Sequence, residues 1–400
     1  MAAKSNFGHW RAALLCAAVV VARPAYGQEP AVPGTPPPLL TPAAAAAPPP
    51  DHPAPLGRTE APGVQPTTLP WHDTYLYWDH ALSANTLGVG QDYQSRDPVY
   101  EMTIGLRPRY YLLEDPNKSI SVRADLGVVT ERTNSDTTTK QGEWSATDFE
   151  LYGAFSYKLR ESKSDLTELA LRLPRVTLPT SKISYDSGKL LGLGVRVGAR
   201  EDVVLEGRDA TFFPNIELIA KAEYGYQFTR SETPTNSNLE RIRLDPDGHS
   251  IVSDQLSGAT FARHAAVFGV ATLLHIHQSV LLSSSLDLRP AWKYPVQHDV
   301  GVCVLTGCAQ ATGVSDPQTR SVLTLFTSEF LITLTDTLGL SLGYANLTAQ
   351  LGPDGRRRSV FYSPDARFYA TLSVSLDHAY SSLTHRDQQT ASAASGPRIP

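Results

Sequence analysis

The stretch YEMTIGLRPRYYL (Tyr100–Leu112) alternates apolar residues with polar or small ones almost without interruption. Successive side chains of a β-strand point to opposite faces, so this stretch predicts a strand with one apolar and one charged face. Arg107 and Arg109 lie two residues apart and share the charged face. The fold depends on which of the two faces looks inward. Alternation alone does not answer this, because a soluble sheet alternates in the same way.

The first 27 residues have the layout of a secretory signal peptide. Lys4 and Arg11 precede the apolar run AALLCAAVVVA (residues 12–22), and AYG (residues 25–27) is a small-x-small cleavage site. The apolar run is too short for a membrane-spanning helix, which needs about 20 residues. We therefore expect export and cleavage after Gly27.

The remaining chain divides into three parts. Residues 28–70 are dominated by Pro and Ala and lack any periodicity, which is typical of a disordered, partly polyproline linker. Residues 381–400 are expected to form a disordered tail. Residues 71–380 hold repeated period-two runs and predict one all-β domain. Cleavage removes three cations and no acid, so the formal net charge moves from −5 to −8 and does not favour a nucleic-acid partner.

The period-two runs predict twelve strands, which we place at residues 74–84, 99–113, 118–130, 146–160, 167–178, 189–200, 212–228, 259–274, 279–292, 319–334, 337–349 and 365–377. Their connections alternate between long loops and short turns such as EDPN (Glu114–Asn117) and TDT (Thr335–Thr337); only the connection near 201–211 is of middling length. This alternation over an even number of strands is typical of a closed antiparallel transmembrane β-barrel. A Greek-key sandwich is not expected to show it.

Charged side chains gather on one face of these strands. We predict that they line the lumen of the barrel, and the candidates are Arg107, Arg109, Arg123, Asp125, Asp148, Glu150, Arg196, Arg200, Glu217, Lys221, Asp287, Arg289, Glu329 and Arg367. Twelve strands enclose more space than side chains can fill, so an apolar interior would be hard to pack. Aromatic residues also cluster near strand ends, as at Tyr110 and Tyr111, where membrane barrels carry their girdles. We therefore expect the apolar face to contact lipid and the charged face to enclose water.

On these features the chain resembles the bacterial outer-membrane β-barrel class over residues 71–380, and it is faintly similar to uncharacterised barrels of myxobacteria. The resemblance implies a Gram-negative outer membrane, lipid as the surrounding partner and assembly by the outer-membrane insertion machinery. One feature departs from the class. Many such barrels end in an aromatic residue, whereas SVSLDHAY (residues 373–380) is followed by a further stretch of chain.

The sequence offers few candidates for catalysis or metal binding. Ser283–Ser285 lie close in sequence to His275 and His277, but nothing marks the third group that would orient a catalytic base. Two histidines do not complete a metal site, and the acidic loop LDPDGHSIVSD (residues 244–254) lacks the spacing of a calcium-binding hand. We predict that the protein is not an enzyme and has no catalytic residue, metal or cofactor.

Cys303 and Cys308 are the only cysteines left after processing and lie in the long ninth connection. An even number of cysteines in an exported chain predicts a disulfide, which here would stiffen a loop tip. Two free thiols are the alternative.

The charges on the inner face nearly balance in sign. Buried dry they would be prohibitive, so we expect a hydrated interior. We predict a passive channel or porin for small solutes with weak ion selectivity. The alternatives are a non-conducting barrel for surface display or envelope anchoring, and a soluble secreted β-protein.

Overall fold

The computed structural model describes residues 69–84, 99–133, 142–162, 165–186, 188–204, 215–230, 240–244, 250–254, 262–277, 279–294, 301–304, 307–310, 320–350, 357–363 and 366–384. The expected signal peptide and nearly all of the Pro/Ala-rich linker lie outside these residues. In the described part of the chain, no helix is both long enough and apolar enough to cross a membrane.

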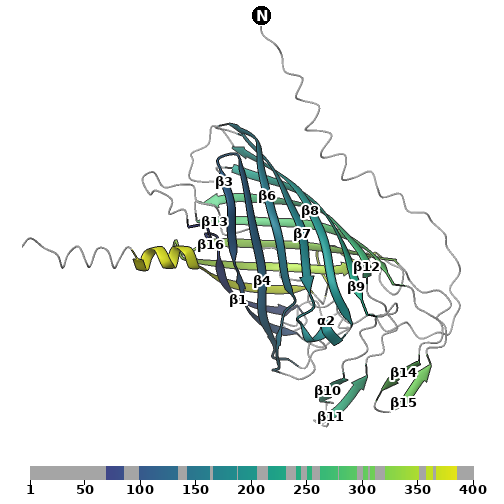
Figure 1. The fold of residues 1–400 in the computed structure, drawn as a ribbon. Helices are drawn as coiled ribbons and strands as arrows, with labels where there is room; N and C mark the ends of the chain where they lie inside the picture. The colour runs from purple at the N-terminus through teal and green to yellow at the C-terminus, as the bar shows by residue number, and fades with distance from the viewer. Residues whose placement is uncertain are drawn as a thin grey trace, which may run out of the picture. The chain divides into compact units, whose positions relative to one another are not determined.

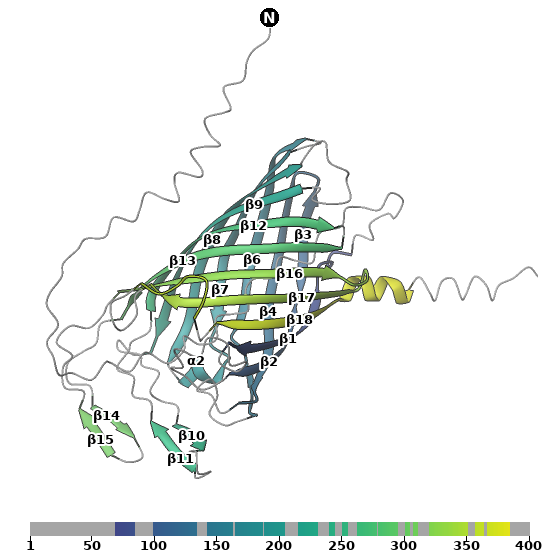
Figure 2. The same ribbon diagram turned by 180° about the vertical axis from the view of Figure 1, so that it is seen from behind.

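One large antiparallel sheet closes on itself to form a barrel (Figures 1 and 2). Its segments are β1 (Tyr75–Ser83), β2 (Tyr100–Arg107), β3 (Arg109–Asp115), β4 (Lys118–Glu131), β5 (Trp144–Ala146), β6 (Phe149–Ser162), β7 (Asp165–Leu178), β8 (Lys189–Val204), β9 (Asn215–Thr229), β12 (Ala262–His277), β13 (Val280–Lys293), β16 (Arg320–Thr333), β17 (Leu338–Ala349) and β18 (Arg367–Ser375). The closing pair is β1 with β18, in register from Tyr75↔Ser375 to Ser83↔Arg367.

Two of the barrel strands are interrupted. β2 and β3 both pair with β4 and are separated only by Pro108, which has no N–H to donate to the ladder. β5 and β6 also both pair with β4, from its other side, and residues 147–148 separate them. Counted in this way the barrel has twelve strands, so the predicted fold class and strand number are confirmed.

Shorter elements lie in the long connections. They are α2 (Lys182–Asp186) between β7 and β8, the hairpin β10 (Glu240–Leu244) with β11 (Ser250–Asp254), and the hairpin β14 (Gly301–Val304) with β15 (Gly307–Gln310).

The end of the barrel differs from the sequence-based expectation. The last strand stops at Ser375, and residues 376–384 form a helix (Figure 1). The ring of Tyr380 in this helix lies 5.6 Å from that of Trp71, edge to face. The helix therefore extends past residue 380, and the expectation of a disordered tail is corrected for residues 381–384.

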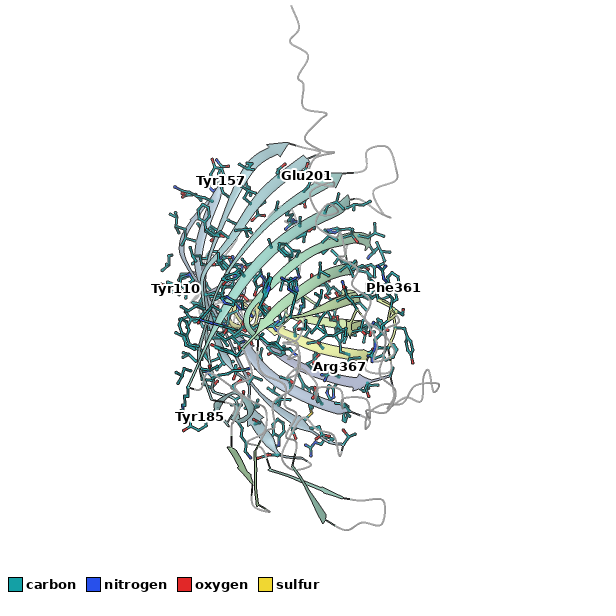
Figure 3. All side chains as sticks on the ribbon, turned by 90° about the vertical axis from the view of Figure 1, so that its right-hand side faces the viewer. Tyr110, Tyr157, Tyr185, Glu201, Phe361 and Arg367 are labelled. Carbon is teal, nitrogen blue, oxygen red and sulfur yellow. The ribbon has the colours of Figure 1, made fainter. Side chains whose placement is uncertain are left out.

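The wall of the barrel has an apolar outside and a polar inside. Large apolar side chains are exposed on the outer face, among them Leu76, Trp78, Ile104, Leu126, Val128, Leu193, Val197, Phe268, Val270 and Phe330. Figure 3 shows Tyr110 and Tyr157 on this outer side of the strands. On the inner face, Asp79, Glu101, Glu217, Asp287 and Glu329 are buried. The charged face of Tyr100–Leu112 thus looks inward, which is the reverse of a soluble barrel.

Candidate functional site

The interior of the barrel is lined by charged side chains that pair with one another across neighbouring strands. Arg107 shows the pattern: its Nε donates to Asp125 Oδ2 at 2.5 Å, and its guanidinium lies 4.5 Å from the centre of the Tyr77 ring. The Tyr77 hydroxyl also donates to Asp125, at 3.3 Å. The predicted lumen residues Arg107 and Asp125 are therefore brought together and held against an aromatic ring.

Arg109 on β3 pairs with Asp73, a residue that precedes β1. Its Nη1 lies 2.6 Å from Asp73 Oδ2, and its Nε donates to Ser121 Oγ at 3.2 Å. The Tyr111 hydroxyl donates to the same Asp73 oxygen at 2.6 Å. Hydrogen bonds to charged groups contribute more than neutral ones, so this cluster ties the start of β1 to β3 and β4.

A longer chain of ion pairs crosses β6, β7, β8 and β9. Arg175 reaches Glu150 at 2.7 Å through Nη2 and also pairs with Glu223 through Nη1. Glu223 in turn accepts from Arg196 Nε at 2.6 Å. Two carboxylates and two guanidinium groups thus alternate along this chain. Their mutual attraction offsets the free-energy cost of removing each charge from water.

Two further clusters involve β8, β9, β12 and β13. Glu217 lies 3.1 Å from Arg200 Nε and 2.7 Å from His275 Nε2. Arg200 also pairs with Asp202, at 2.8 Å.

Asp287 is almost fully buried and lies 2.9 Å from Lys221 Nζ and 3.1 Å from Arg289 Nη2. Here two predicted lumen cations share one predicted lumen acid.

The wall around the closing strands is also charged. Arg367 Nη1 lies 2.6 Å from Glu101 Oε2. Glu329 accepts from the hydroxyls of Ser341 and Tyr369, at 2.9 and 3.1 Å. Two hydroxyl groups therefore donate hydrogen bonds to the buried carboxylate of Glu329.

Asp148 binds a connecting segment between two strands. It lies in the break between β5 and β6, where its carboxylate accepts from the backbone N–H of Ser181 at 3.0 Å and from Ser184 Oγ at 2.6 Å. Both partners belong to the turn and helix around α2. Asp148 therefore anchors this connecting segment, and its lumen-lining role stays a prediction.

Arg123 differs from the paired cations around it. Its Nε is shielded from solvent and has no hydrogen-bond partner in the described structure. It lines a cavity of about 20 Å³ together with Asp73, Tyr75, Arg107, Pro108, Arg109, Ala124 and Tyr152. A cavity of this size has room for about one water molecule.

Sequence reasoning missed several interior residues. Arg175 follows Arg172 by three positions, so simple alternation places the two on opposite faces. A register shift between β7 and β8 at Arg172/Arg175 returns both to the inner face. A bulge adds a residue to one strand only, and period-two counting cannot see it. Asp73 was missed because it precedes β1, and only the folded barrel brings it to Arg109.

The candidate serines and histidines have partners within the wall. Ser284 Oγ lies 3.2 Å from Ser328 Oγ, and Ser285 Oγ lies 2.6 Å from Thr327 Oγ1. His275 faces Glu217. Among the described residues, no group of three or more His, Cys, Asp or Glu side chains is arranged to hold a metal ion.

The two cysteines lie on β14 and β15, where Cys303 is the direct register partner of Cys308. Directly opposed residues of an antiparallel pair have Cα atoms about 4.5–5.5 Å apart, a separation that a disulfide can bridge. The disulfide remains a prediction, since the register concerns the backbone alone.

At the start of β1, outside the strands, the pKa values of two groups are shifted. Burial lowers the pKa of His72, but hydrogen bonds to Asp73 and Glu114 outweigh it and raise the pKa above the usual 6.5. Burial also raises the pKa of Asp73, yet its bonds to His72 and Tyr111 and the charge of Arg109 hold it well below the usual range. The network thus favours the protonated imidazole of His72 and the ionised carboxylate of Asp73.

No family model and no curated protein matches the chain. Among solved structures it is similar to an outer membrane channel from Pseudomonas putida F1, with a TM-score of 0.43 and 13% identity over 78% of this chain and 99% of that one. It is also similar to the transport unit of the autotransporter AIDA-I from Escherichia coli (TM-score 0.34, 6% identity, 76% and 89% of the two chains). Outer membrane phospholipase A from Escherichia coli gives 0.30 and 8%, over 78% and 93%. At this level of similarity none of their activities carries over to this chain.

Proposed function

We propose that this protein is an integral outer-membrane barrel that acts as a passive channel for small solutes, with weak ion selectivity. The observation that carries the proposal is the distribution of residues across the wall: ion pairs and hydroxyls line the inside, and large apolar side chains cover the outside. Only a barrel surrounded by lipid and filled by water places both sets in a favourable solvent.

The closed sheet supports residence in a membrane. The sheet closes through the pairs β1–β18, β1–β2 and β2–β4, so among the described residues the first and last strands of the barrel are not left as open edges. In the hydrocarbon core there is no water to satisfy such groups, and only helices and closed barrels can span it. The continuous apolar exterior would be an aggregation hazard in water.

Weak ion selectivity follows from the pairing of charges. The cations Arg107, Arg196, Lys221 and Arg367 each have a carboxylate partner within hydrogen-bond distance. Charged rings set ion preference in a pore, and neutralised pairs exert a weaker field on a passing ion.

Membrane fractionation tests the location. We expect the mature chain to sediment with the outer membrane and to resist extraction by carbonate or urea. Recovery in the soluble periplasmic or culture fraction would contradict the membrane assignment.

Planar-bilayer recording tests the channel. The purified, refolded full-length chain should give discrete steps of modest conductance with little preference between potassium and chloride. The same preparation unfolded in denaturant and diluted without refolding is the control and should give none. If the folded chain inserts but never conducts, the channel proposal fails and a non-conducting barrel takes its place.

A further inference from the structure

We propose that the lumen holds an oxyanion-binding site centred on Arg123, which takes the carboxylate or phosphate group of a small anionic solute. The site rests on the proposed channel, because a solute must enter the barrel to reach it. It would make the lumen specific for a class of solute without requiring strong selectivity between simple ions.

The site is built from one row of residues that runs across four adjacent strands. In register, Arg109 on β3 faces Arg123 on β4, Arg123 faces Tyr152 on β6, and Tyr152 faces Arg175 on β7. Direct register partners in an antiparallel sheet point to the same side. These four side chains therefore lie next to one another on the inner face.

Of the three arginines in this row, the two outer ones are neutralised and Arg123 between them is not. Arg109 pairs with Asp73, and Arg175 pairs with Glu150 and Glu223. For Arg123, the described residues supply neither an ion pair nor a hydrogen bond to its shielded Nε. A buried donor without a partner is costly, and each such group calls for an explanation such as a ligand or ion.

The position of Arg123 directly opposite Arg109 also favours a bound anion. Like charges placed directly opposite each other on neighbouring strands destabilise a sheet, and Arg109 and Arg123 are such a pair. A bound oxyanion would relieve the repulsion and satisfy the free Nε together. The cavity beside Arg123 marks the place where its first oxygen would lie.

The row continues into glycines that leave space for a solute. Arg175 faces Gly194 on β8, and Gly194 faces Gly225 on β9. A Cβ placed on Gly225 would meet only the carbonyl oxygen of Leu193, at 3.7 Å. A Cβ on Gly194 would lie 3.1 Å from the carbonyl oxygen of Tyr224, so the open space beside the row is at Gly225. That space would take part of the body of a solute whose anionic end is held at Arg123.

The chemistry of the row selects an oxyanion. A guanidinium presents a planar fork of N–H donors that matches two oxygens of a carboxylate or phosphate. The Tyr75 and Tyr152 side chains also line the cavity, and their hydroxyl groups are of a kind that donates to anions. A halide is a single atom and cannot offer two oxygens to the two donors of the guanidinium fork. The site should therefore distinguish oxyanions from chloride.

Binding can be measured without voltage, by isothermal titration calorimetry on the refolded full-length chain in a non-ionic detergent and chloride buffer. Inorganic phosphate and citrate are titrated in separate arms, with neutral glycerol as the blank. Arg123→Gln should weaken binding of the preferred oxyanion at least tenfold, which corresponds to about 1.4 kcal/mol. Arg123→Lys, which keeps the charge but loses the fork, should fall between Gln and wild type.

Arg367→Gln is the matched control, because it removes one lumen cation from β18, where Glu101 is its partner. It should bind the oxyanion within twofold of wild type. Phosphate binding above citrate would assign a phosphate-bearing solute, and the reverse a carboxylate. The site is refuted if wild type binds neither oxyanion, if Arg123→Gln binds as well as wild type, or if Arg367→Gln loses as much.

The urea midpoint of Arg123→Gln separates loss of binding from loss of folding. It should equal or exceed that of wild type, because the substitution removes the repulsion between Arg109 and Arg123. A lower midpoint would show that Arg123 is a structural cation and would overturn the site. Binding that persists in a preparation without conductance would refute the channel alone and leave the site standing.

Discussion

The aromatic ring of Tyr77 on β1 occupies the space that Gly105 leaves open on β2. The two residues are direct register partners, and a Cβ on Gly105 would lie 2.3 Å from atoms of the ring. Tyr369 on β18 lies over Gly343 on β17 in the same way, at 2.2 Å. Both tyrosines are buried on the inner face. On either side of the closing pair β1–β18, a glycine therefore admits a tyrosine ring against the backbone.

Replacing Gly343 by Ala should destabilise the barrel by about 1–3 kcal/mol, because the new methyl group must displace the Tyr369 ring. Urea unfolding in lipid vesicles measures the change. Gly225→Ala is the control: a Cβ there meets one backbone oxygen at an ordinary contact distance, so stability should be unchanged or slightly higher. Equal effects at the two positions would show that the packing of the Tyr369 ring does not require a glycine at position 343.

Replacing Leu126 by Arg should cost about 2–4 kcal/mol if the outer face contacts lipid, because Leu126 is exposed outward near the middle of β4. Leu112 is also exposed but lies near the short turn, where the cost of an arginine falls to about 0–1 kcal/mol. Unfolding free energies of the two variants in lipid provide the comparison. A negligible cost at both positions would contradict a lipid-facing wall.

Replacing Arg107 and Arg109 together by Glu should shift the channel toward cations. Both guanidinium groups lie on the inner face, and the exchange turns two positive charges of the wall into two negative ones. The reversal potential in a potassium chloride gradient measures the shift. The same exchange at Arg357 and Arg358, in the last long connection, is the control for charge outside the strands. An unchanged potential in the Arg107/Arg109 variant would mean that these arginines do not border the open path.

The His72 cluster should make stability weakly dependent on pH. The pKa of His72 is raised in the folded state, so its contribution is complete below pH 6.5 and is lost as pH rises through the folded-state pKa. The imidazole faces the carboxylates of Asp73 and Glu114 and stacks on the Tyr111 ring. For a partly exposed pair the effect is about 0.5 kcal/mol.

His72→Gln tests this prediction through urea midpoints at pH 5.5 and pH 8.5. Wild type should lose stability relative to the variant between the two values. A difference that does not change with pH would assign the midpoint shift to packing against Tyr111 and not to charge.

Local pattern was sufficient to predict the architecture of the barrel. Period-two alternation depends only on the pleat of a strand, so the twelve strands and the charged face of Tyr100–Leu112 could be read without knowing any partner. The alternation of long loops and short turns gave the antiparallel order for the same reason. Residues predicted to share the charged face do meet in the structure, as Arg107 and Asp125 do, and the lining of an open lumen by these residues stays a prediction.

Pairing within the lumen depended on register, which the sequence does not display. A shift between Arg172 and Arg175 returned a missed arginine to the interior, and closure of the barrel brought Glu101 to Arg367 across most of the chain. Only the folded barrel places the rings of Tyr77 and Tyr369 over Gly105 and Gly343. The sequence alone determined the strands and their two faces, because these follow from neighbours along the chain. The tertiary structure decided which charges are neutralised, and it leaves Arg123 Nε without a hydrogen-bond partner among the described residues, because only strand register sets the distances between side chains remote in sequence.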